Sequence, residues 1–421
     1  MHILFLSHYF PPEVNAPASR TYENAKRWVR AGHKVTVLTC HPSHPGGVVY
    51  PGFTNSVHAW DEIDGIRVLR VGTYLSANKG FMKRISNYVS FMLSAVAQCG
   101  RVRDVDLVVS TSPQFFCGMA GYFVSRLKRC PWVLEIRDLW PESIIAVGAI
   151  RNRRVIRALE GVESFLYRKA DHIISLTKAF KRHITARGVG EEKVSIVTNG
   201  ADLERYAPGG RMNEVRRELG LGEDVFLASY IGTHGMAHGL GTVLRAAKRL
   251  ENEPNIRFLL VGDGAEREKL LREKDEMGLT NVIMLGQQPK ERMPDFLAAT
   301  DACLVLLIKS ELFKTVLPSK IFEAMATGRP IVLGVEGESR ELVEEGGCGL
   351  CIEPENDAEL AEAVRRLAQD PGLRWELGER GQDYVARNFD RETLAMRYLG
   401  ILEGVVEKGT KLLRELARRS L

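Results

Sequence analysis

Short apolar stretches rich in β-branched residues alternate with longer amphipathic stretches along the first 200 residues. The apolar stretches are predicted to be strands, at residues 2–7, 34–39, 66–71, 106–110, 132–136, 172–176 and 194–199. Between them, apolar residues recur with helical spacing, as at 18–31 and 156–169. This alternation is typical of βαβ units on a parallel sheet. We therefore expect a doubly wound α/β domain.

The same pattern starts again after the polar stretch NGADLERYAPGG at 199–210. A second set of strands is predicted at 225–232, 256–262, 281–286, 302–307, 330–334 and 349–354. A chain of 421 residues is also too long for one ordinary core. We therefore predict two Rossmann-like domains, 1–203 and 204–389. Because ligands of such sheets bind outside the carboxyl ends of the strands, we expect a central cleft that both domains face.

Three loops that follow predicted strands carry glycines or helix-starting residues. Their sequences are SHYFPPEVNAPASR at 7–20, GTHGMAHGLG at 232–241 and VGDGAEREKL at 261–270. Glycines let the backbone approach a ligand, and the helix N-terminus that follows offers N–H donors to an anion. One such loop could serve only to turn the chain. Three together favour a phosphate-binding site at the strand ends.

Composition and charge narrow the range of possible partners and cellular locations. The chain has 58 basic and 53 acidic residues, a net charge of +5, which is far from the basic surface of a nucleic-acid binder. The seven cysteines are scattered and no signal peptide is predicted, so we expect a reduced, cytoplasmic protein. The CGLC stretch at 348–351 has redox spacing, but a structural role is favoured. No apolar run reaches the roughly 18–20 residues that span a bilayer.

The sequence offers no clear metal site. No cluster with metal-ligand spacing appears, and the acidic stretch DVD at 104–106 leads directly into a predicted strand. We therefore expect neither a metal nor a cofactor. No nucleophile with triad spacing is visible either, which favours chemistry by positioning and electrostatics.

Seven stretches carry a resemblance to a known family: FPPEVNAPASR, AGHKVTVLT, EIRDLWPES, TNGADLERYAP, VGDGAEREKL, NVIMLG and LPSKIFEAMATGRPIV. Through them essentially the whole chain resembles the retaining glycosyltransferases of family 4, which have two Rossmann-like domains in the GT-B arrangement. More narrowly, it resembles the O-antigen and capsule branch that includes N-acetyl-L-fucosamine transferases. The resemblance implies transfer of N-acetyl-L-fucosamine or another N-acetyl-hexosamine from a UDP-sugar to a lipid-linked or saccharide acceptor. It also implies that 390–421 forms a helix that crosses back to the first domain, followed by a basic tail.

The resemblance implies a donor site in the second domain. Glu323 stands at the family's second glutamate, which bonds the ribose hydroxyls, and Thr315 stands where a first glutamate approaches the donor sugar. The family commonly has Arg and Lys in the loop at 232–239, where this chain has Thr233 and His238. Lys320 is our candidate for the missing diphosphate countercharge and for a catalytic role; a solvated loop lysine is the alternative. The other implied donor-binding residues are Gly232, His234, Gly262, Leu317, Pro318 and Ser319.

The first domain supplies the other implied residues. Arg137 and Asp138 stand where the family often has His-Asp, and we expect them to be catalytic, with a plain salt bridge as the alternative. Asn15 and Ala16 stand at the family's usual Gly-Gly, and Arg20 lies one turn further on. These three are predicted to bind the acceptor.

The stretch 78–103 predicts a helix over 80–100 with an apolar face and basic flanks. Its apolar residues are Phe81, Ile85, Tyr88, Val89, Met92 and Val96, and its flanking cations are Lys79, Lys83, Arg84, Arg101 and Arg103. This make-up favours contact with an anionic membrane, and a core helix is the alternative. The basic tail, with Lys411, Arg414 and Arg418, adds to that attraction. We expect a peripheral protein at the inner face of the cell membrane.

Two other functions stay open on the sequence. One is a sugar-nucleotide epimerase of the same two-domain shape, which would need acid and base residues that the sequence does not identify. The other is a non-catalytic, transferase-like partner subunit. The departures at Thr315, Thr233 and His238 keep the second alternative open.

Overall fold

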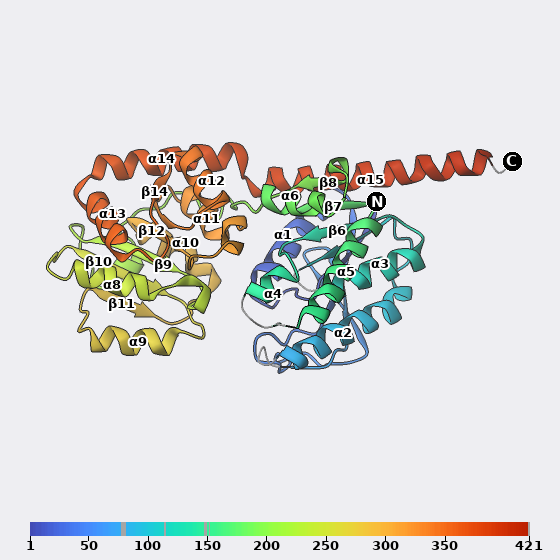
Figure 1. Cartoon of the computed structure of the whole chain (residues 1–421), viewed down its shortest axis with the longest axis horizontal. Coiled ribbons are helices and arrows are strands. Elements are labelled where there is room, and N and C mark those ends of the chain that lie inside the picture. The colour runs from blue at the N-terminus through green and yellow to red at the C-terminus, as the bar shows by residue number, and fades with distance from the viewer. Residues whose placement is uncertain (77–80, 113–114, 147–149, 151, 420–421) are drawn as a thin grey trace. The chain divides into compact units, whose positions relative to one another are not determined.

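The computed structural model of the chain describes all residues except 77–80, 113–114, 147–149, 151 and 420–421. It contains two compact units, each a sheet with its connecting helices (Figure 1). The first unit is Met1–Val197 together with Glu392–Leu421, and the second is Thr198–Arg391.

The first unit is built on an eight-stranded sheet in the order β3-β4-β2-β1-β5-β6-β7-β8. Its strands are β1 (His2–Leu6), β2 (Lys34–Cys40), β3 (His58–Ile63), β4 (Ile66–Val71), β5 (Leu107–Thr111), β6 (Trp132–Ile136), β7 (His172–Ser175) and β8 (Val194–Ile196). All neighbours are parallel except β3 and β4. The seven predicted strands are confirmed. The edge strand β3 was missed because half of its sequence, HAWDEI, is polar and no side chain in it is fully buried.

Helices connect these strands. They are α1 (Ala16–Arg30), α2 (Phe81–Gln98), α3 (Phe115–Lys128), α4 (Glu142–Ala146), α5 (Arg153–Lys169) and α6 (Lys178–Ala186), with short 3-10 turns η1 (Cys99–Arg101) and η2 (Glu191–Lys193). Helix α1 starts on a cap, since the Asn15 side chain accepts a hydrogen bond from the Ala18 N–H at 2.9 Å.

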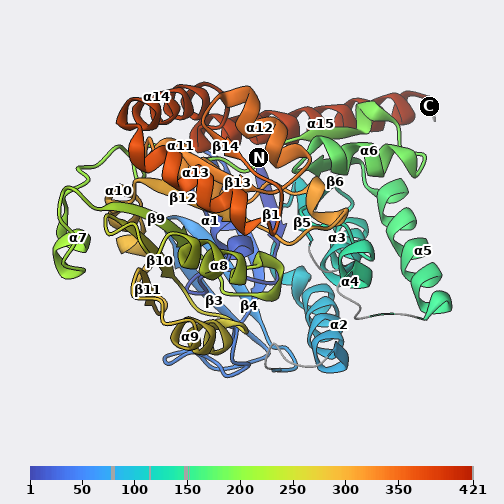
Figure 2. The same cartoon turned by 60° about the vertical axis from the view of Figure 1, so that its left-hand side comes forward.

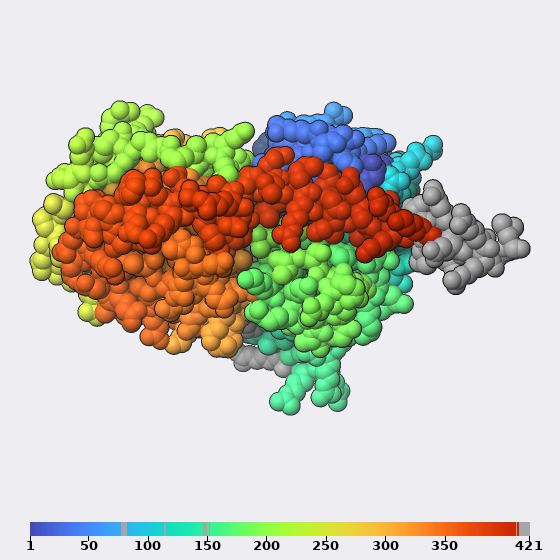
Figure 3. Space-filling view, turned by 90° about the horizontal axis from the view of Figure 1, so that it is seen from above, coloured from blue at the N-terminus to red at the C-terminus, as the bar shows by residue number. Residues whose placement is uncertain are grey.

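The C-terminal helix α15 (Arg391–Arg419) returns to the first unit, as predicted. The indole N–H of Trp28 donates to the Ala395 carbonyl at 3.0 Å, and the Trp28 and Tyr398 rings are 5.1 Å apart. In space-filling view the helix lies over the first unit, between its blue and green segments (Figure 3). The predicted basic residues Lys79, Arg414 and Arg418 lie outside the described side chains, as does the Phe81 side chain.

Helix α2 lies beside α3 (Figure 2) and turns most of its predicted apolar face onto the core of the first unit. Tyr88 is buried, and Met92 and Val96 pack against the same buried cluster. The core-helix alternative therefore describes these three residues. Met82 and Leu93, by contrast, are 72% and 61% exposed. Contact of this helix with a membrane stays a prediction.

The second unit has a six-stranded, fully parallel sheet in the order β11-β10-β9-β12-β13-β14. Its strands are β9 (Phe226–Ile231), β10 (Ile256–Val261), β11 (Val282–Leu285), β12 (Ala302–Leu306), β13 (Ile331–Gly334) and β14 (Gly349–Cys351), which confirms all six predictions. Its helices are α7 (Glu214–Glu218), α8 (Gly241–Arg249), α9 (Arg267–Glu276), α10 (Met293–Ala299), α11 (Ser319–Ala326), α12 (Glu338–Gly346), α13 (Asp357–Gln369) and α14 (Pro371–Asn388), and its 3-10 turns are η3 (Met236–His238), η4 (Lys290–Arg292) and η5 (Leu312–Thr315).

Candidate functional site

In the second unit, the loops that follow β9 and β10 touch through backbone atoms at two glycines. The Gly232 N–H donates to the Val261 carbonyl at 2.9 Å. Gly262 has a φ of 143°, and a Cβ added there would lie 2.0 Å from the Gly232 oxygen. No other residue fits that position, because both the backbone conformation and the space exclude a side chain. The glycine pair therefore fixes how the two loops meet.

The backbone of His234 links the same two loops through hydrogen bonds. Its N–H donates to the Asp263 carbonyl and its own carbonyl accepts from the Glu266 N–H, both at 2.9 Å. The His234 side chain is fully buried, and neither ring nitrogen has a hydrogen-bond partner among the described residues. Burial lowers the pKa of His234, so the ring is neutral at neutral pH. Two unpaired ring nitrogens leave it available to a ligand or a water.

Lys320 lies in the first turn of α11, close to the β9 loop. Its ammonium nitrogen is 3.8 Å from the centroid of the Tyr230 ring, and a Cβ on Gly232 would be 2.8 Å from it. That nitrogen is buried and has no hydrogen-bond partner within the described part of the chain. Burial lowers the pKa of Lys320 to about 7. The alternative of a solvated loop lysine does not describe this side chain.

The start of α11 adds backbone donors beside that cation. Pro318 occupies the N-cap position, where no side chain caps the first N–H groups. Ser319 is the first residue of the helix, and Leu317 precedes the cap in a partly buried stretch. An uncapped helix start next to a buried ammonium group is suited to an anion.

Glu323 lies one turn after Lys320 on α11. The Tyr206 hydroxyl is hydrogen-bonded to the Glu323 carboxylate. Burial raises the pKa of Glu323, while the nearby Arg391 and Lys320 cations act in the opposite direction. Arg391 is itself held by the Gly200 carbonyl at 2.9 Å.

Sequence reasoning missed Tyr206 and Arg391 as neighbours of Glu323. They come from two stretches that are nearly 200 residues apart in the chain, and only folding brings them together. The one available signal was the stretch TNGADLERYAP, which contains Tyr206 and carries the family resemblance.

Thr315 and Thr233 are less enclosed. The Thr315 hydroxyl donates to the Leu312 carbonyl at 2.7 Å within η5, so its own donor is engaged locally. Thr233 is exposed, and its carbonyl accepts from the Tyr230 hydroxyl at 2.9 Å. Their roles toward a donor stay predictions.

His238 lies near Lys320 in the turn η3. Burial, with the Lys320 cation nearby, lowers the pKa of His238 to about 4. The imidazole is therefore neutral at neutral pH in the free protein, and its role toward a donor stays a prediction. Lys320 is left as the buried cation among the predicted donor-site residues of the second unit that the structure describes.

In the first unit, Arg20 and Arg137 converge on the buried Glu135. Arg20 Nε is 2.9 Å from Glu135 Oε1, and its Nη2 donates to the Val197 carbonyl at 2.9 Å. Although burial raises the pKa of Glu135, Arg20 and Arg137 lower it below its ordinary value. Arg20 thus has a clear structural partner, and its predicted contact with an acceptor stays a prediction.

Arg137 keeps unpaired donors at this strand end. Its Nη2 donates to the Ala16 carbonyl at 3.1 Å, whereas its buried Nε and Nη1 have no partner among the described residues. Burial lowers the pKa of Arg137 to about 10, so the group remains cationic. The structure therefore brings Asn15, Ala16, Arg20 and Arg137 to one region, where α1 begins and β6 ends.

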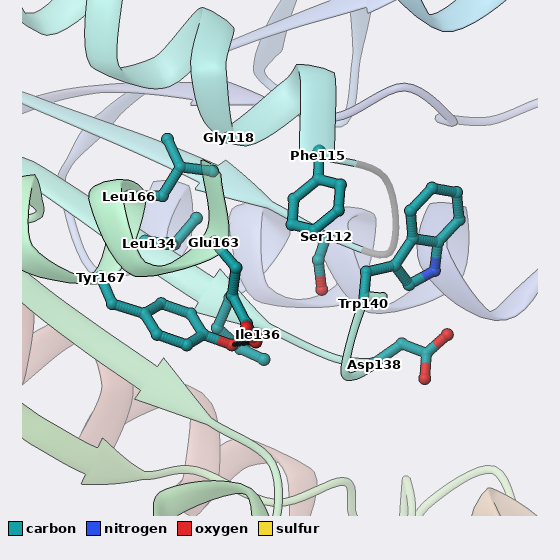
Figure 4. Close-up of a pocket in the computed structure, with 10 residues that line it drawn as sticks. All are labelled: Ser112, Phe115, Gly118, Leu134, Ile136, Asp138, Trp140, Glu163, Leu166 and Tyr167. Carbon is teal, nitrogen blue, oxygen red and sulfur yellow. Dashed lines mark hydrogen bonds between the residues drawn. The ribbon is translucent and has the colours of Figure 1, made fainter. Parts of the chain in front are cut away.

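Asp138 lines a pocket of the first unit (Figure 4). Asp138 and Trp140 lie at one side of this pocket, and Glu163 with Tyr167 lies at the other. Burial raises the pKa of Asp138 to about 6, above the ordinary range of a carboxyl group. Asp138 forms no plain salt bridge with Arg137 among the described contacts, so that alternative is not supported.

One group of possible metal ligands occurs within the described residues: Glu142, Glu163 and His183. Arg187 already pairs with this group, at 2.7 Å from Glu142 and 3.3 Å from Glu163. A guanidinium cation opposes the binding of a metal ion at the same carboxylates. The cluster is therefore described as an ion-pair network, and metal independence stays a prediction.

No helix in the described part of the chain is long and apolar enough to cross a membrane.

Two sequence families together match most of the chain. Residues 15–200 match the family described as glycosyl transferase 4-like domain, and residues 212–384 match the family described as glycosyl transferases group 1.

The similarity to several known proteins covers nearly the full length of the chain. The chain is 24% identical, over 96% of its own length and 100% of the other, to the putative colanic acid biosynthesis glycosyl transferase WcaI of Escherichia coli (strain K12). Its fold is similar to sucrose-phosphate synthase from Thermosynechococcus elongatus, with a TM-score of 0.75, 19% identity and coverage of 97% and 99% of the two chains. It is also similar to Anabaena Alr3699/HepE in complex with UDP and glucose, with a TM-score of 0.71, 20% identity and coverage of 95% and 99%. These likenesses confirm the predicted GT-B fold.

Proposed function

Because the chain belongs to the glycosyltransferases, with a 4-like domain followed by a group 1 domain, we propose that it transfers a sugar from a UDP-sugar with retention of anomeric configuration. The acceptor is a lipid-linked or saccharide chain in the biosynthesis of a cell-surface polysaccharide.

The observation that carries this proposal is the buried, unpartnered ammonium group of Lys320. A buried ammonium group without a hydrogen-bond partner is costly, and the oxygens of the donor diphosphate supply both the partner and further negative charge. The N–H groups at the start of α11 add oriented donors beside the same ammonium group. The similarity to HepE, whose structure contains UDP and glucose, supports UDP as the nucleotide.

Glu323 holds the ribose in this proposal. A carboxylate accepts hydrogen bonds from two vicinal hydroxyls, and Tyr206 and Arg391 fix its position. Thr315 faces the donor sugar where the family has a glutamate, and His234 and Gly262 shape the wall of the donor site.

The chemistry follows from charge development on the leaving group. When the bond between the anomeric carbon and the diphosphate breaks, negative charge builds on the diphosphate oxygens, and Lys320 stabilises it. The acceptor hydroxyl attacks from the same face and gives its proton to the departing oxygen. The protein supplies position and electrostatics, and no step requires a metal ion.

The polysaccharide context is supported by the similarity to a putative colanic acid glycosyl transferase. We propose that the donor carries N-acetyl-L-fucosamine or another N-acetyl-hexosamine, as the sequence resemblance implies.

The proposed attachment to a membrane is supported by exposed residues of two helices in the first unit. Met82 and Leu93 of α2 and Leu127 of α3 are between 61% and 72% exposed, and Lys83 and Arg126 are exposed on the same helices. Apolar side chains with cations among them are suited to an anionic leaflet. We place the enzyme at the inner face of the cell membrane.

A donor panel tests the proposal. The purified chain is incubated with UDP-, GDP- and dTDP-sugars and membrane extract in EDTA, and nucleotide release, labelled lipid and anomeric configuration are measured. We expect release of UDP and a product with the donor's configuration. Transfer from no UDP-sugar, or an inverted product, would contradict it, and binding of a sugar nucleotide without transfer would favour the non-catalytic subunit.

A further inference from the structure

A second polar pocket of the first unit lies where β1, β2 and β4 end. Its walls come from four places: the loops after β1, β2 and β4, and helix α2. The lining residues are His8, Tyr9, Ser43, His44, Pro45, Ser76, Arg84, Asn87 and Tyr88. The pocket is open to solvent, and its cavity volume is about 20 Å³. No predicted site residue lines it.

Buried polar atoms in this pocket lack partners. His8 is only 5% exposed, and its Nδ1 has no hydrogen-bond partner among the described residues. The His8 side chain is held in place by a hydrogen bond with Asn87 and by ring contacts with Tyr9, Tyr88 and Phe91 at 4.7–5.2 Å. A fixed ring with one free nitrogen is a preformed contact for a ligand.

Arg84 gives the pocket its charge. Its Nη2 is 3.3 Å from the Tyr88 hydroxyl, while its buried Nε has no partner in the described part of the chain. Burial lowers the pKa of His8 to about 3, and burial together with Arg84 lowers the pKa of His44. With both imidazoles neutral, Arg84 carries the one formal charge among the nine lining residues.

A single guanidinium group surrounded by neutral hydroxyl and imidazole groups is suited to a ligand that carries both an anionic group and hydroxyl groups. The polar groups approach from four segments of the fold, the loops after β1, β2 and β4 and helix α2. That arrangement suits a tetrahedral phosphate better than a planar carboxylate, which a guanidinium group binds edge to edge.

We propose that this pocket binds a phosphate group of the acceptor, through Arg84 with His8, Tyr9 and Ser43. The inference rests on the proposed function, because it identifies the acceptor as a phosphorylated sugar or as a sugar joined to a lipid by a phosphate. The phosphate anchors the acceptor in the first unit. The exposed Met82, two residues before Arg84 on α2, is placed to meet the lipid of a membrane-bound acceptor.

Binding of glucose 1-phosphate to the full chain tests this inference, by calorimetry with saturating UDP so that the donor site is occupied. We compare the parent with Arg84→Gln, Arg84→Lys and the matched control Lys83→Gln, which removes an exposed cation one residue away. Glucose and glucuronate test the need for phosphate. Vesicles of neutral lipid with and without undecaprenyl phosphate distinguish a lipid-borne phosphate from a free one.

We expect Arg84→Gln to weaken glucose 1-phosphate binding about tenfold or more, Arg84→Lys to weaken it less, and Lys83→Gln to leave it unchanged. Binding of UDP and the melting temperature should be the same in all four proteins. Tighter binding to vesicles with undecaprenyl phosphate, lost in Arg84→Gln, would identify the lipid-borne source.

Equal binding by the parent and Arg84→Gln, binding of glucuronate as tight as that of glucose 1-phosphate, or no binding of any phosphate probe would overturn the inference. Failure to bind UDP would instead contradict the proposed donor site in the second unit.

Discussion

Lys320 connects the binding of the donor to pH. Because burial lowers its pKa to about 7, a large share of the ammonium group is deprotonated in the free protein above that pH. A bound diphosphate favours the protonated form and raises this pKa, so binding takes up a proton. The affinity for UDP should therefore fall as pH rises above 7.

The size of this effect is set by the pKa shift. Between pH 7.5 and 9, where UDP stays fully ionised, we expect the affinity of the parent for UDP to fall about tenfold. Lys320→Met should bind UDP weakly with little change over the same range. The exposed Lys314→Met is the control and should follow the parent, and a flat profile in the parent would contradict the role of Lys320.

The proposed role of Glu323 can be tested separately from that of Lys320, because Glu323 is expected to bind the ribose and Lys320 the diphosphate. We expect Glu323→Gln to weaken UDP binding about tenfold, because two hydroxyls lose a charged acceptor. Binding of inorganic pyrophosphate, which has no ribose, should be unchanged. Calorimetry with both ligands checks this, and an equal loss for the two would place Glu323 near the phosphates instead.

Arg20 has a structural role that the sequence did not predict. Its removal leaves the fully buried Glu135 with Arg137 as its remaining guanidinium partner among the described residues, so Arg20→Gln should lower the free energy of unfolding by about 3 kcal/mol. Lys26→Gln on the same helix breaks an exposed pair with Asp64 and should cost under about 1 kcal/mol. Urea denaturation checks both, and a stable Arg20→Gln would return Arg20 to the role of a purely acceptor-binding residue.

At the residue scale, the sequence could predict neighbours that one helix places together, such as Lys320 and Glu323. It could not predict Tyr206, Tyr230 or Arg391 around them, because those contacts depend on how distant segments pack. It also could not predict that the ammonium nitrogen of Lys320 is buried, since burial depends on how the whole unit packs.

At the element scale, the strands of both units were predictable because buried parallel strands are continuous apolar runs. The strand β3 was not, since it lies at a sheet edge and its side chains are only partly covered. Helix α2 shows another limit of prediction from the sequence pattern. An apolar face with basic flanks is the same pattern whether the face meets a membrane or a core, and the structure places Tyr88 in the core.

The meeting of the β9 and β10 loops makes an element-scale prediction. Gly262→Ala puts a Cβ 2.0 Å from the Gly232 oxygen at a φ of 143°, so the loops must separate. We expect a loss of at least about 2 kcal/mol in the stability of the second unit, together with weaker UDP binding. Gly210→Ala is the control, because nothing lies within 4 Å of its added Cβ, and its change should stay within about 0.5 kcal/mol. Thermal unfolding with and without UDP distinguishes the two, and a Gly262→Ala protein as stable as the parent would contradict the close contact.

At the scale of the whole molecule, each unit holds one half of the proposed reaction. The second unit offers a buried cation for the donor diphosphate, and the first offers Arg84 and Arg137 with unpaired donor groups. Both units thus contain cationic side chains with buried N–H groups that lack a hydrogen-bond partner among the described residues, and such groups are costly until a ligand pairs with them. In the proposed reaction, the phosphates of the donor and of the acceptor are those ligands.

The most direct test of the proposed role of Lys320 is the steady-state rate of sugar transfer from a UDP-sugar to membrane acceptors, measured in EDTA for the parent, Lys320→Met and Lys314→Met. We expect turnover by the parent, unchanged turnover by Lys314→Met, and a kcat at least about 100-fold lower in Lys320→Met, because a transition-state charge loses its stabilising group. Equal turnover by the parent and Lys320→Met, or turnover that EDTA abolishes and a divalent metal restores, would contradict it.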